Sequence, residues 1–290
     1  MKVLGFGEIL WDVFGERKTI GGAPLNLLGH IRKLGGEASI ISAVGDDDLG
    51  TGSIDAIDKL GIERKYLKIS EFETGKAVIS LENGIPSYSF NYPAAWDDIS
   101  FPQEILSEIV QKEYSVFIYG SLAQRSPTSR NTLTYLIDKI KADEFFFDVN
   151  LRLNFWSKET IVNGLRKATI LKMNDEEVPL VSKCLGVPEA GLFEYIFNEF
   201  PVNKIVVTKG KDGAECHEKG MTFKSAAADC KVIDTVGAGD SLSAGFIYFL
   251  LCGCSTQEAL NKAAILADYV VTKQGAIPDY DDELLERLKG

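Results

Sequence analysis

The stretch "VIDTVGAGDSLSAGF", Val232–Phe246, decides how the rest of the sequence is interpreted. Glycine permits a close backbone approach, so the turn Gly237-Ala238-Gly239 can present its amides to an anion. The apolar residues that follow predict a buried helix, whose first turn leaves amides unpaired and carries a partial positive charge. Asp240 falls in that turn, where a carboxylate can orient a hydroxyl and accept its proton. An aspartate that only caps a strand-to-helix turn is the alternative that this stretch leaves open.

Two other phosphate-binding motifs are missing from the sequence. The pattern G-x-x-x-x-G-K-[ST] of ordinary P-loop proteins does not occur. "GAGDSL" has Leu242, and "GFGEIL" has Leu10, where a dinucleotide fingerprint requires its third glycine. The sequence therefore argues against a P-loop protein and against a dinucleotide-dependent oxidoreductase.

A second glycine cluster, "TIGGAPLNLLGHIRKLGG" at 19–36, has the residues that a polyol site needs. Its two adjacent glycines bring the backbone close to a ligand, and Asn26 enters the first helical turn with both a donor and an acceptor. Asp12, which follows an apolar strand, can accept hydrogen bonds from the same sugar. A helix cap for Asn26 and a solvated turn for Asp12 are the alternatives, and His30 is interpreted as structural.

The composition is that of a soluble globular protein. The chain has 290 residues, 45% of them hydrophobic and 25% charged, with a formal net charge of -11. The acidic balance argues against a nucleic-acid partner, and no apolar run approaches the roughly 20 residues that span a membrane. Five scattered cysteines and two histidines predict neither a disulfide framework nor a zinc site. A cytoplasmic protein is expected.

Strand and helix patterns alternate along most of the chain, which predicts one domain, 1–290, with a mostly parallel sheet covered by helices. The expected strands are 2–7, 38–45, 114–120, 144–150, 168–174 and 204–210. The expected helices are 25–34, 51–60, 102–112, 127–141, 189–199 and about 255–272. Ser126-Pro127 and the capping box "STQE" mark two of the helix starts.

Residues 63–92 break this alternation, because they contain strand patterns without a convincing helix. Asn83-Gly84 is a strong hairpin signal. Together with residues 11–20, the segment predicts a small separate sheet that acts as a lid over the carboxyl ends of the main strands. A plain antiparallel extension of the sheet edge is the alternative.

The two glycine clusters also carry a family resemblance. "GGAPLNLLGHIRKLGGEASIISAVGDD" together with "DTVGAGDSLSAGF" resembles the two signatures of the ribokinase-like (PfkB) carbohydrate kinases, in order and in separation. "GEILWDVF" and "GGAPLN" are most similar to the bacterial fructokinases, although Leu28 replaces a residue that is usually small. The resemblance covers essentially the whole chain. It implies a three-layer ribokinase-like α/β fold, a small β-sheet lid and a homodimer formed through that lid.

The resemblance further implies an ATP-dependent transfer to a primary hydroxyl of a small sugar, with D-fructose giving fructose 6-phosphate. Asp240 matches the catalytic base, and the turn before it matches the anion hole made by Gly237, Ala238 and Gly239. "FDVNLRLNFW" resembles the fructokinase stretch D-P-N-x-R…W, with Val149 in place of the proline. The implied substrate-binding residues are Asp12, Gly22, Asn26, Asn150 and Arg152. A structural salt bridge is the alternative role for Arg152.

ATP and Mg²⁺ are the implied cofactors, with K⁺ as a further candidate. "LKMNDEE" resembles the N-x-x-E element, aligned as Asn174 and Glu177, which would organise Mg²⁺ through water; Glu176 competes with Glu177 for this role. The implied nucleotide-binding residues are Asn174, Thr208, Gly210 and Gly213. Asp234 and the "KQGAIP" segment at 273–278 are implied for the monovalent cation.

Several alternatives stay open at this point. Ribose, 2-keto-3-deoxygluconate or a nucleoside would suit the same family, and Phe90, Tyr92 and Trp96 offer a platform for a base. A sugar phosphate is disfavoured because the stretch 63–92 holds few basic residues. The alternative of another class is a sugar-binding regulatory protein without catalysis.

Overall fold

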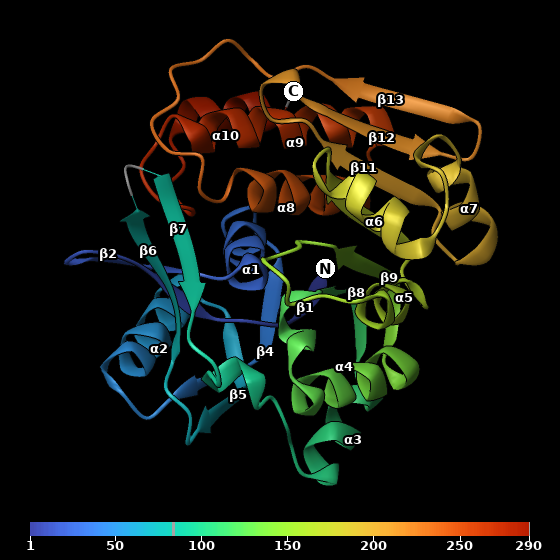
Figure 1. Ribbon diagram of the computed structural model, residues 1–290. Helices are drawn as coiled ribbons and strands as arrows, with labels where there is room; N and C mark the ends of the chain where they lie inside the picture. Colours follow the sequence, from blue (N-terminus) through green and yellow to red (C-terminus); the bar gives the residue numbers. More distant parts are fainter. Residues whose placement is uncertain (83–84, 290) are drawn as a thin grey trace.

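The computed structural model describes residues 1–82 and 85–289. The strands are β1 (Lys2–Phe6), β2 (Leu10–Phe14), β3 (Arg17–Gly21), β4 (Glu37–Gly45), β5 (Glu63–Ser70), β6 (Gly75–Glu82), β7 (Ile85–Phe90), β8 (Glu113–Gly120), β9 (Lys141–Asp148), β10 (Ile170–Asn174), β11 (Lys204–Thr208), β12 (Ala214–Glu218) and β13 (Met221–Ser225). The helices are α1 (Ala23–Lys33), α2 (Asp48–Leu60), α3 (Gln103–Gln111), α4 (Pro127–Lys139), α5 (Lys158–Leu165), α6 (Glu177–Leu185), α7 (Leu192–Glu199), α8 (Ala238–Leu251), α9 (Thr256–Val271) and α10 (Asp282–Lys289). Figure 1 shows their arrangement.

A large sheet forms the centre of the molecule, with the strand order β13-β12-β11-β10-β9-β8-β1-β4-β5. From β11 to β5 all neighbours pair in parallel, and the hairpin β12–β13 adds an antiparallel edge. The six strands expected from the sequence all lie in the parallel part. Their near-continuous apolar runs are typical of strands that are buried on both faces.

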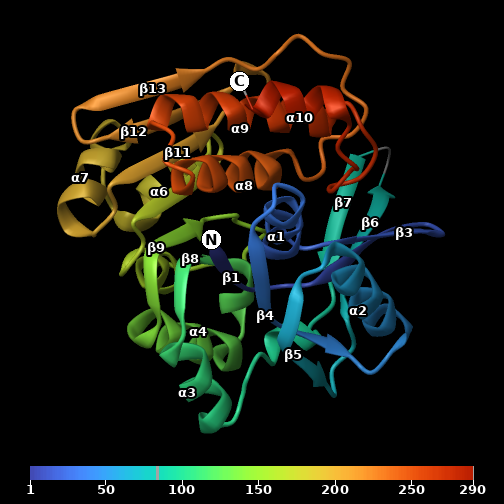
Figure 2. The ribbon, with the colours of Figure 1, turned by 180° about the vertical axis from the view of Figure 1, so that it is seen from behind.

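Helices cover both faces of this sheet, as the two opposite views show (Figures 1 and 2). Helices α3 to α7 pack over one core, which contains Phe117 and Phe147 from the strands. Helices α1, α2, α8, α9 and α10 pack over a second core, which contains Ile40 and Phe146. The adjacent residues Phe146 and Phe147 belong to different cores because successive side chains of a strand point to opposite faces. The expected three-layer α/β fold is confirmed.

A small second sheet, with the order β3-β2-β6-β7, stands beside the large one. The sequence predicted such a sheet from 11–20 and 63–92, but the second range was too long. Residues 63–70 form β5, which pairs in parallel with β4 at the edge of the large sheet. The physical reason is the burial of Tyr66, which is 1% exposed and belongs to the core covered by α3 to α7. The hairpin turn predicted at Asn83-Gly84 lies outside the described residues.

The root of the small sheet is fixed to helix α2. The indole Nε1 of Trp11, on β2, donates to Leu49 O at 3.0 Å and to Ser53 Oγ at 2.9 Å. Just before β6, the Thr74 hydroxyl donates to Asp47 Oδ1 at 2.7 Å, and its backbone N donates to Asp47 Oδ2 at 2.8 Å. Asp47 is also the N-cap of α2. The small sheet and α2 therefore share a hydrogen-bonded base.

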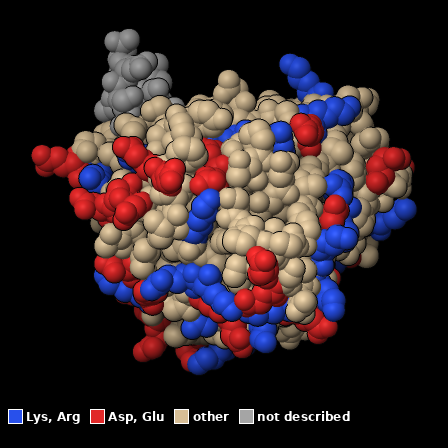
Figure 3. Space-filling view, turned by 90° about the horizontal axis from the view of Figure 1, so that it is seen from below, with Lys and Arg blue, Asp and Glu red and all other residues tan. Residues whose placement is uncertain are grey.

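Two helix starts follow the sequence signals. Helix α9 begins after Ser255, which forms the expected capping box with Glu258. Helix α4 begins at Pro127, as predicted, although the Ser126 side chain makes no capping hydrogen bond. Within the described ranges, none of the helices is both long and apolar enough to cross a membrane. Acidic and basic side chains are interspersed over the face shown in Figure 3.

Candidate active site

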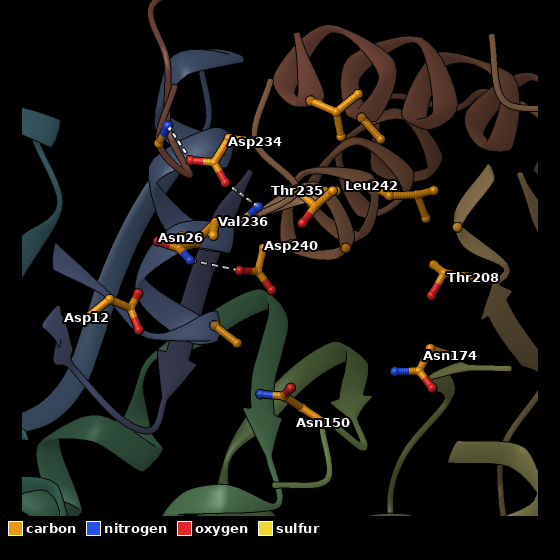
Figure 4. Close-up of a pocket in the computed structure, with 18 of the residues that line it drawn as sticks. Asp12, Asn26, Asn150, Asn174, Thr208, Asp234, Thr235, Val236, Asp240 and Leu242 are labelled. Carbon is orange, nitrogen blue, oxygen red and sulfur yellow. Dashed lines mark hydrogen bonds between the residues drawn. The ribbon is translucent and has the colours of Figure 1, made fainter. Parts of the chain in front are cut away.

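A cavity of about 1430 Å³ lies at the carboxyl ends of β1, β9, β10 and β11. The carboxyl edge of a parallel sheet is the usual ligand site in open α/β folds. Figure 4 shows Asp12, Asn26 and Asp240 on one side of this cavity, and Asn174 and Thr208 on the other. The cavity brings together all the residues predicted for the site except Glu177; its lining includes Asp12, Gly22, Asn26, Asn150, Arg152, Asn174, Thr208, Gly210, Gly213, Asp234, Gly237, Ala238, Gly239 and Asp240.

One face of the small sheet forms the wall next to Asp12. Alternate residues of β2 line the cavity, namely Leu10, Asp12 and Phe14. Directly opposite them in the ladder, Thr19 and Arg17 on β3 and Ala77 on β6 line it too. This is the period of two that a strand requires. The side chain of Asp12 is thus aimed inward by its place in the strand.

Asn26 links the two glycine clusters. Its Nδ2 donates to Asp240 Oδ2 at 2.8 Å, across 214 positions of sequence. Its Oδ1 is buried and, within the described part of the chain, has no hydrogen-bond partner. The backbone of Gly22 opens α1 at φ 114°, and a Cβ there would lie 2.4 Å from Glu8 O. Only glycine fits this position, so it fixes the start of the helix that carries Asn26.

The Gly237 turn is fixed from two sides. Gly237 has φ 79°, and a Cβ there would lie 2.7 Å from Cα of Ala276. Asp234 Oδ1 accepts from Val236 N at 3.0 Å and its Oδ2 accepts from Gly275 N at 3.1 Å, which ties the turn to the "KQGAIP" segment (Figure 4). The Ala238 amide donates to Thr235 O at 3.3 Å, so the amides at the start of α8 that follow it are the ones left for an anion.

The pKa of Asp240 suits a general base that works near neutral pH. Burial raises the pKa of Asp240 to about 6, and the nearby Asp148 adds to the rise. The hydrogen bond from Asn26 and the charges of Lys172 and Arg152 act in the opposite direction on this pKa. At neutral pH the carboxylate is largely ionised and able to accept a proton.

Glu8 is a site residue that the sequence analysis missed. It follows β1, is 2% exposed, and accepts a hydrogen bond from Ala23 N at 3.3 Å. Burial raises its pKa to about 7. Arg152 lines the same cavity, and its charge lowers the pKa values of Glu8, Asp12 and Asp240. An acid directly after a buried strand was the signal that could have identified Glu8.

Glu177 is turned away from the cavity. Its Oε1 accepts from Leu151 N at 2.7 Å and its Oε2 from Asn174 N at 2.8 Å, while its own N donates to Asn174 Oδ1 at 2.8 Å. The carboxylate thus holds the Asn150–Arg152 loop and the end of β10. Asn150 itself is left-handed at φ 39°, a conformation that asparagine tolerates better than most residues.

Glu176 and Asp175 line the cavity instead. Their carboxylates are the hard oxygen donors that Mg²⁺ prefers, so the residues present fit the ion. Of the two glutamates left open by the sequence, Glu176 is the one that faces the cavity.

The end of the cavity beyond Thr208 is mainly apolar. Gly213 is left-handed at φ 87°, and a Cβ there would lie 2.0 Å from Ser225 O. The sequence analysis missed the remaining walls, which combine the charged residues Lys211, Asp229 and Asp268 with small or apolar ones, namely Ala227, Ala228, Cys230, Val232, Ala267 and Val271. Small apolar side chains from a loop and from α9 leave a slot that suits a flat aromatic base.

Lys172 and Asp148 form a buried ion pair at the base of the cavity that the sequence analysis also missed. Lys172 Nζ lies 3.0 Å from Asp148 Oδ1, and the two side chains are 8% and 7% exposed. Burial disfavours the ammonium form, but the carboxylates of Asp148, Glu177 and Asp240 outweigh it and raise the pKa of Lys172. A lysine inside the apolar run "ATILKMN" was the available signal.

Comparison with known proteins agrees with this geometry. The model of the pfkB family carbohydrate kinases matches residues 3–283. The ATP-dependent 6-phosphofructokinase of Thermoanaerobacterium thermosaccharolyticum is 26% identical over an alignment of 298 residues, gaps included. The alignment covers 97% of this chain and 91% of that protein. The probable fructokinase-5 of Arabidopsis thaliana is 26% identical, covering 95% and 93%.

Among solved structures, the fructokinase with bound ATP from Xylella fastidiosa superposes with a TM-score of 0.83. It is 20% identical and covers 95% of this chain and 94% of that one, a likeness that shows the fold. The family model spans nearly the whole chain. The chain therefore belongs to the PfkB family of carbohydrate kinases and is an ATP-dependent sugar kinase.

Proposed function

We propose that the protein transfers the γ-phosphoryl group of ATP to the primary hydroxyl of D-fructose, giving fructose 6-phosphate and ADP. The observation that carries this proposal is the contact between Asn26 and Asp240 at the N-terminus of α8. It puts a polyol-binding amide, a proton acceptor and an anion-binding helix end side by side. Each is a separate requirement of phosphoryl transfer to an alcohol.

In the proposed reaction, Asp240 accepts the proton of the sugar hydroxyl as its oxygen forms a bond to the γ-phosphorus. The bond from that phosphorus to the bridging oxygen breaks, and its electron pair leaves with ADP. The unpaired amides that follow Ala238 at the start of α8 hold the charge of the group in transfer. Asp175 and Glu176 would hold Mg²⁺ through its water shell, and the ion would neutralise phosphate charge.

The sugar end of the cavity supports a small polyol. Asp12 can accept hydrogen bonds, and Arg152 and Asn150 can supply donors. Burial raises the pKa of Asp12 and the charge of Arg152 opposes the rise, so this carboxylate is partly shielded from water. We assign the monosaccharide to this end and the nucleotide to the apolar end beyond Thr208.

A sugar phosphate is the second candidate acceptor. Arg17, on β3, lines the cavity at the same end. The sequence analysis counted basic residues only within 63–92 and therefore did not consider Arg17. One relative named above is a 6-phosphofructokinase. A phosphate at the far end of the sugar would meet Arg17, whereas free fructose leaves this guanidinium in water.

A coupled ADP-release assay over a panel of acceptors tests the proposal. The panel holds fructose, fructose 6-phosphate, ribose, 2-keto-3-deoxygluconate and a nucleoside, each measured as kcat/KM. Fructose is expected to lead by at least about tenfold, the discrimination available from one or two hydroxyl contacts. A clear preference for another acceptor contradicts the fructose assignment. Sugar-dependent thermal stabilisation without ADP formation would instead indicate a regulatory sugar-binding protein.

We further infer that 1–290 is one kinase domain in which the small sheet serves as the lid, and that two lids form a homodimer. The support is the outer face of the small sheet, where Val13 and Val78 lie opposite each other and Val78 is 40% exposed. Sedimentation of the purified protein should give twice the monomer mass, and Val78→Asp should shift it toward the monomer. A monomeric wild-type protein contradicts the dimer.

A further inference from the structure

His30 is a fully buried polar residue on α1, one helical turn beyond Asn26. It is 0% exposed, and its ring stacks on that of Tyr280 with 15° between the two planes. Burial lowers the pKa of His30 to about 4, so the ring is neutral at physiological pH. Burying a polar side chain is costly unless its polar atoms are paired, so the partners of the two ring nitrogens explain what holds this histidine in place.

Both ring nitrogens of His30 have partners, and the partners fix which nitrogen carries the proton. Nε2 lies 2.8 Å from the backbone oxygen of Ala276, which can only accept, so Nε2 is the donor. Nδ1 of this neutral ring is therefore the acceptor, and the hydroxyl of Tyr280 donates to it at 2.6 Å. The ring thus fastens α1 at two points to the segment 276–280, which follows α9 in the chain.

Ala276 forms the back of the glycine turn that precedes α8. A Cβ on Gly237 would lie 2.7 Å from Cα of Ala276 and 2.8 Å from its backbone oxygen, the atom that accepts from His30. The preceding residue, Gly275, donates its backbone N to Asp234 Oδ2 at 3.1 Å. Because the two backbones are in contact and packed interiors transmit displacements, a shift of Ala276 would move the turn.

These contacts form a closed path around the proposed base. From α1, Asn26 donates to Asp240 Oδ2 at 2.8 Å (Figure 4). Asp240 belongs to the same turn as Gly237, which packs on Ala276, and the hydrogen bond from His30 leads back to α1. Two connections rather than one therefore set the distance between the helix that carries Asn26 and the turn that carries the base.

We propose that His30 is a positioning residue for phosphoryl transfer, which holds the turn at 237–240 at a set distance from α1 through its hydrogen bond to Ala276 O. The turn then keeps Asp240 and the helix-end amides aligned with a sugar hydroxyl that α1 helps to bind. His30 is not among the described residues that line the cavity, so it acts through Ala276. Misplacing reacting groups by about 1 Å costs on the order of 100-fold in rate. The inference rests on the proposed role of Asp240 and its turn.

Two amide substitutions separate the contacts of His30. Glutamine places its amide nitrogen where Nε2 of the ring lies, so His30→Gln can keep the hydrogen bond to Ala276 O. The shorter His30→Asn reaches only the position of Nδ1 and retains at most the contact with Tyr280. His30→Leu removes both contacts without leaving an unpaired polar side chain, and it keeps the test decisive if the asparagine variant does not fold. Ile137→Ala is the control for lost stability, because Ile137 is 0% exposed on α4 in the other core.

Steady-state kinetics with the acceptor that the wild-type protein prefers distinguish positioning from a merely structural role. We expect His30→Asn and His30→Leu to lose about 10- to 100-fold in kcat, while KM for the sugar and for ATP stays within about threefold of wild type. His30→Gln should recover kcat to within about threefold of wild type. Ile137→Ala should lower Tm and retain kcat, because its cavity lies away from the turn.

Hydrogen exchange of the amides at 237–242 adds a readout that does not depend on turnover. Exchange there should be faster in His30→Asn and His30→Leu than in wild type and in His30→Gln. Faster exchange with an unchanged kcat would leave His30 only a structural role and overturn the inference. The absence of recovery in His30→Gln, or a kcat loss in Ile137→Ala as large as that in His30→Leu, would overturn it as well.

The proposed substrate and the proposed base fail by different results. Absence of wild-type turnover with fructose contradicts the substrate alone, because the variants are compared on the preferred acceptor. Near-normal turnover of Asp240→Asn contradicts the base, and hydrogen exchange then still decides whether His30 holds the turn.

Discussion

Replacing Glu8 by glutamine should make the protein more stable at alkaline pH. Glu8 is 2% exposed, and its pKa is raised from 4.5 to about 7 by burial. A rise of about 2.5 pKa units corresponds to roughly 3 kcal/mol of lost folding free energy once the buried carboxyl is ionised. Glutamine retains an oxygen that can accept the hydrogen bond from Ala23 N, and it cannot ionise.

The sign of the effect follows from proton binding. Between pH 4.5 and about 7 the folded protein keeps the Glu8 proton while the unfolded chain releases it. The free energy of unfolding therefore falls as the pH rises through this window, and the loss is complete above it. From pH 5 to pH 8, Glu8→Gln should gain roughly 2 to 3 kcal/mol relative to wild type.

Urea denaturation at pH 5 and pH 8 measures this difference for wild type, for Glu8→Gln and for a control, Glu104→Gln, which changes an exposed glutamate on α3. The control should show the same change in the free energy of unfolding between pH 5 and pH 8 as wild type. If Glu8→Gln also shows the same change as wild type, the reasoning is refuted, because Glu8 would then be ionised in the folded protein without a loss of stability.

The other predictions concern the base and the turn. Because the pKa of Asp240 is about 6 and its ionised form accepts the proton, kcat/KM should fall about tenfold per pH unit below that value. Asp240→Asn should lower kcat at least about 100-fold and retain nucleotide binding; near-normal turnover would exclude Asp240 as the base. Gly237→Ala should lower kcat/KM as well as stability, because its Cβ would lie 2.7 Å from Cα of Ala276 at φ 79°. Gly186→Ala is its control, since Gly186 has a similar φ of 76° with nothing within 4 Å and should lose only about 1 kcal/mol of stability. Equal kinetics for the two alanine variants would mean that the turn tolerates displacement.

Periodicity and glycine patterns predicted the layers of the fold, because they report burial along a single strand or helix. The limit of that information is visible at β5. Nothing local to 63–70 says whether the strand pairs with β4 or with the small sheet, since the choice depends on where Tyr66 is buried. The sequence analysis also missed the hairpin β12–β13 at the opposite edge of the large sheet, because the pairing partner of a strand is not visible in its local sequence.

For the site, the sequence identified residues that belong to distinctive local patterns, such as Asn26 and Asp240. It did not identify Glu8, Asp148 and Lys172, whose roles arise only when separate strands end at the same edge of the sheet. The choice between Glu176 and Glu177 likewise depends on which carboxylate the backbone amides of Leu151 and Asn174 engage.

The shared base of the small sheet and α2 restricts how that sheet can move. Trp11 and Thr74 are both hydrogen-bonded to α2 or its cap, and they stand at the two places where the chain enters the sheet. Because the small sheet is fixed at two points along one edge, it does not rotate as a rigid body about a single hinge. The displacement of a residue in this sheet instead grows with its distance from Trp11 and Thr74. Closing would therefore be a bend of the outer strand segments, greatest near Phe14 and least near Leu10. Stiffness along the strands, rather than freedom at their root, would set the rate of opening.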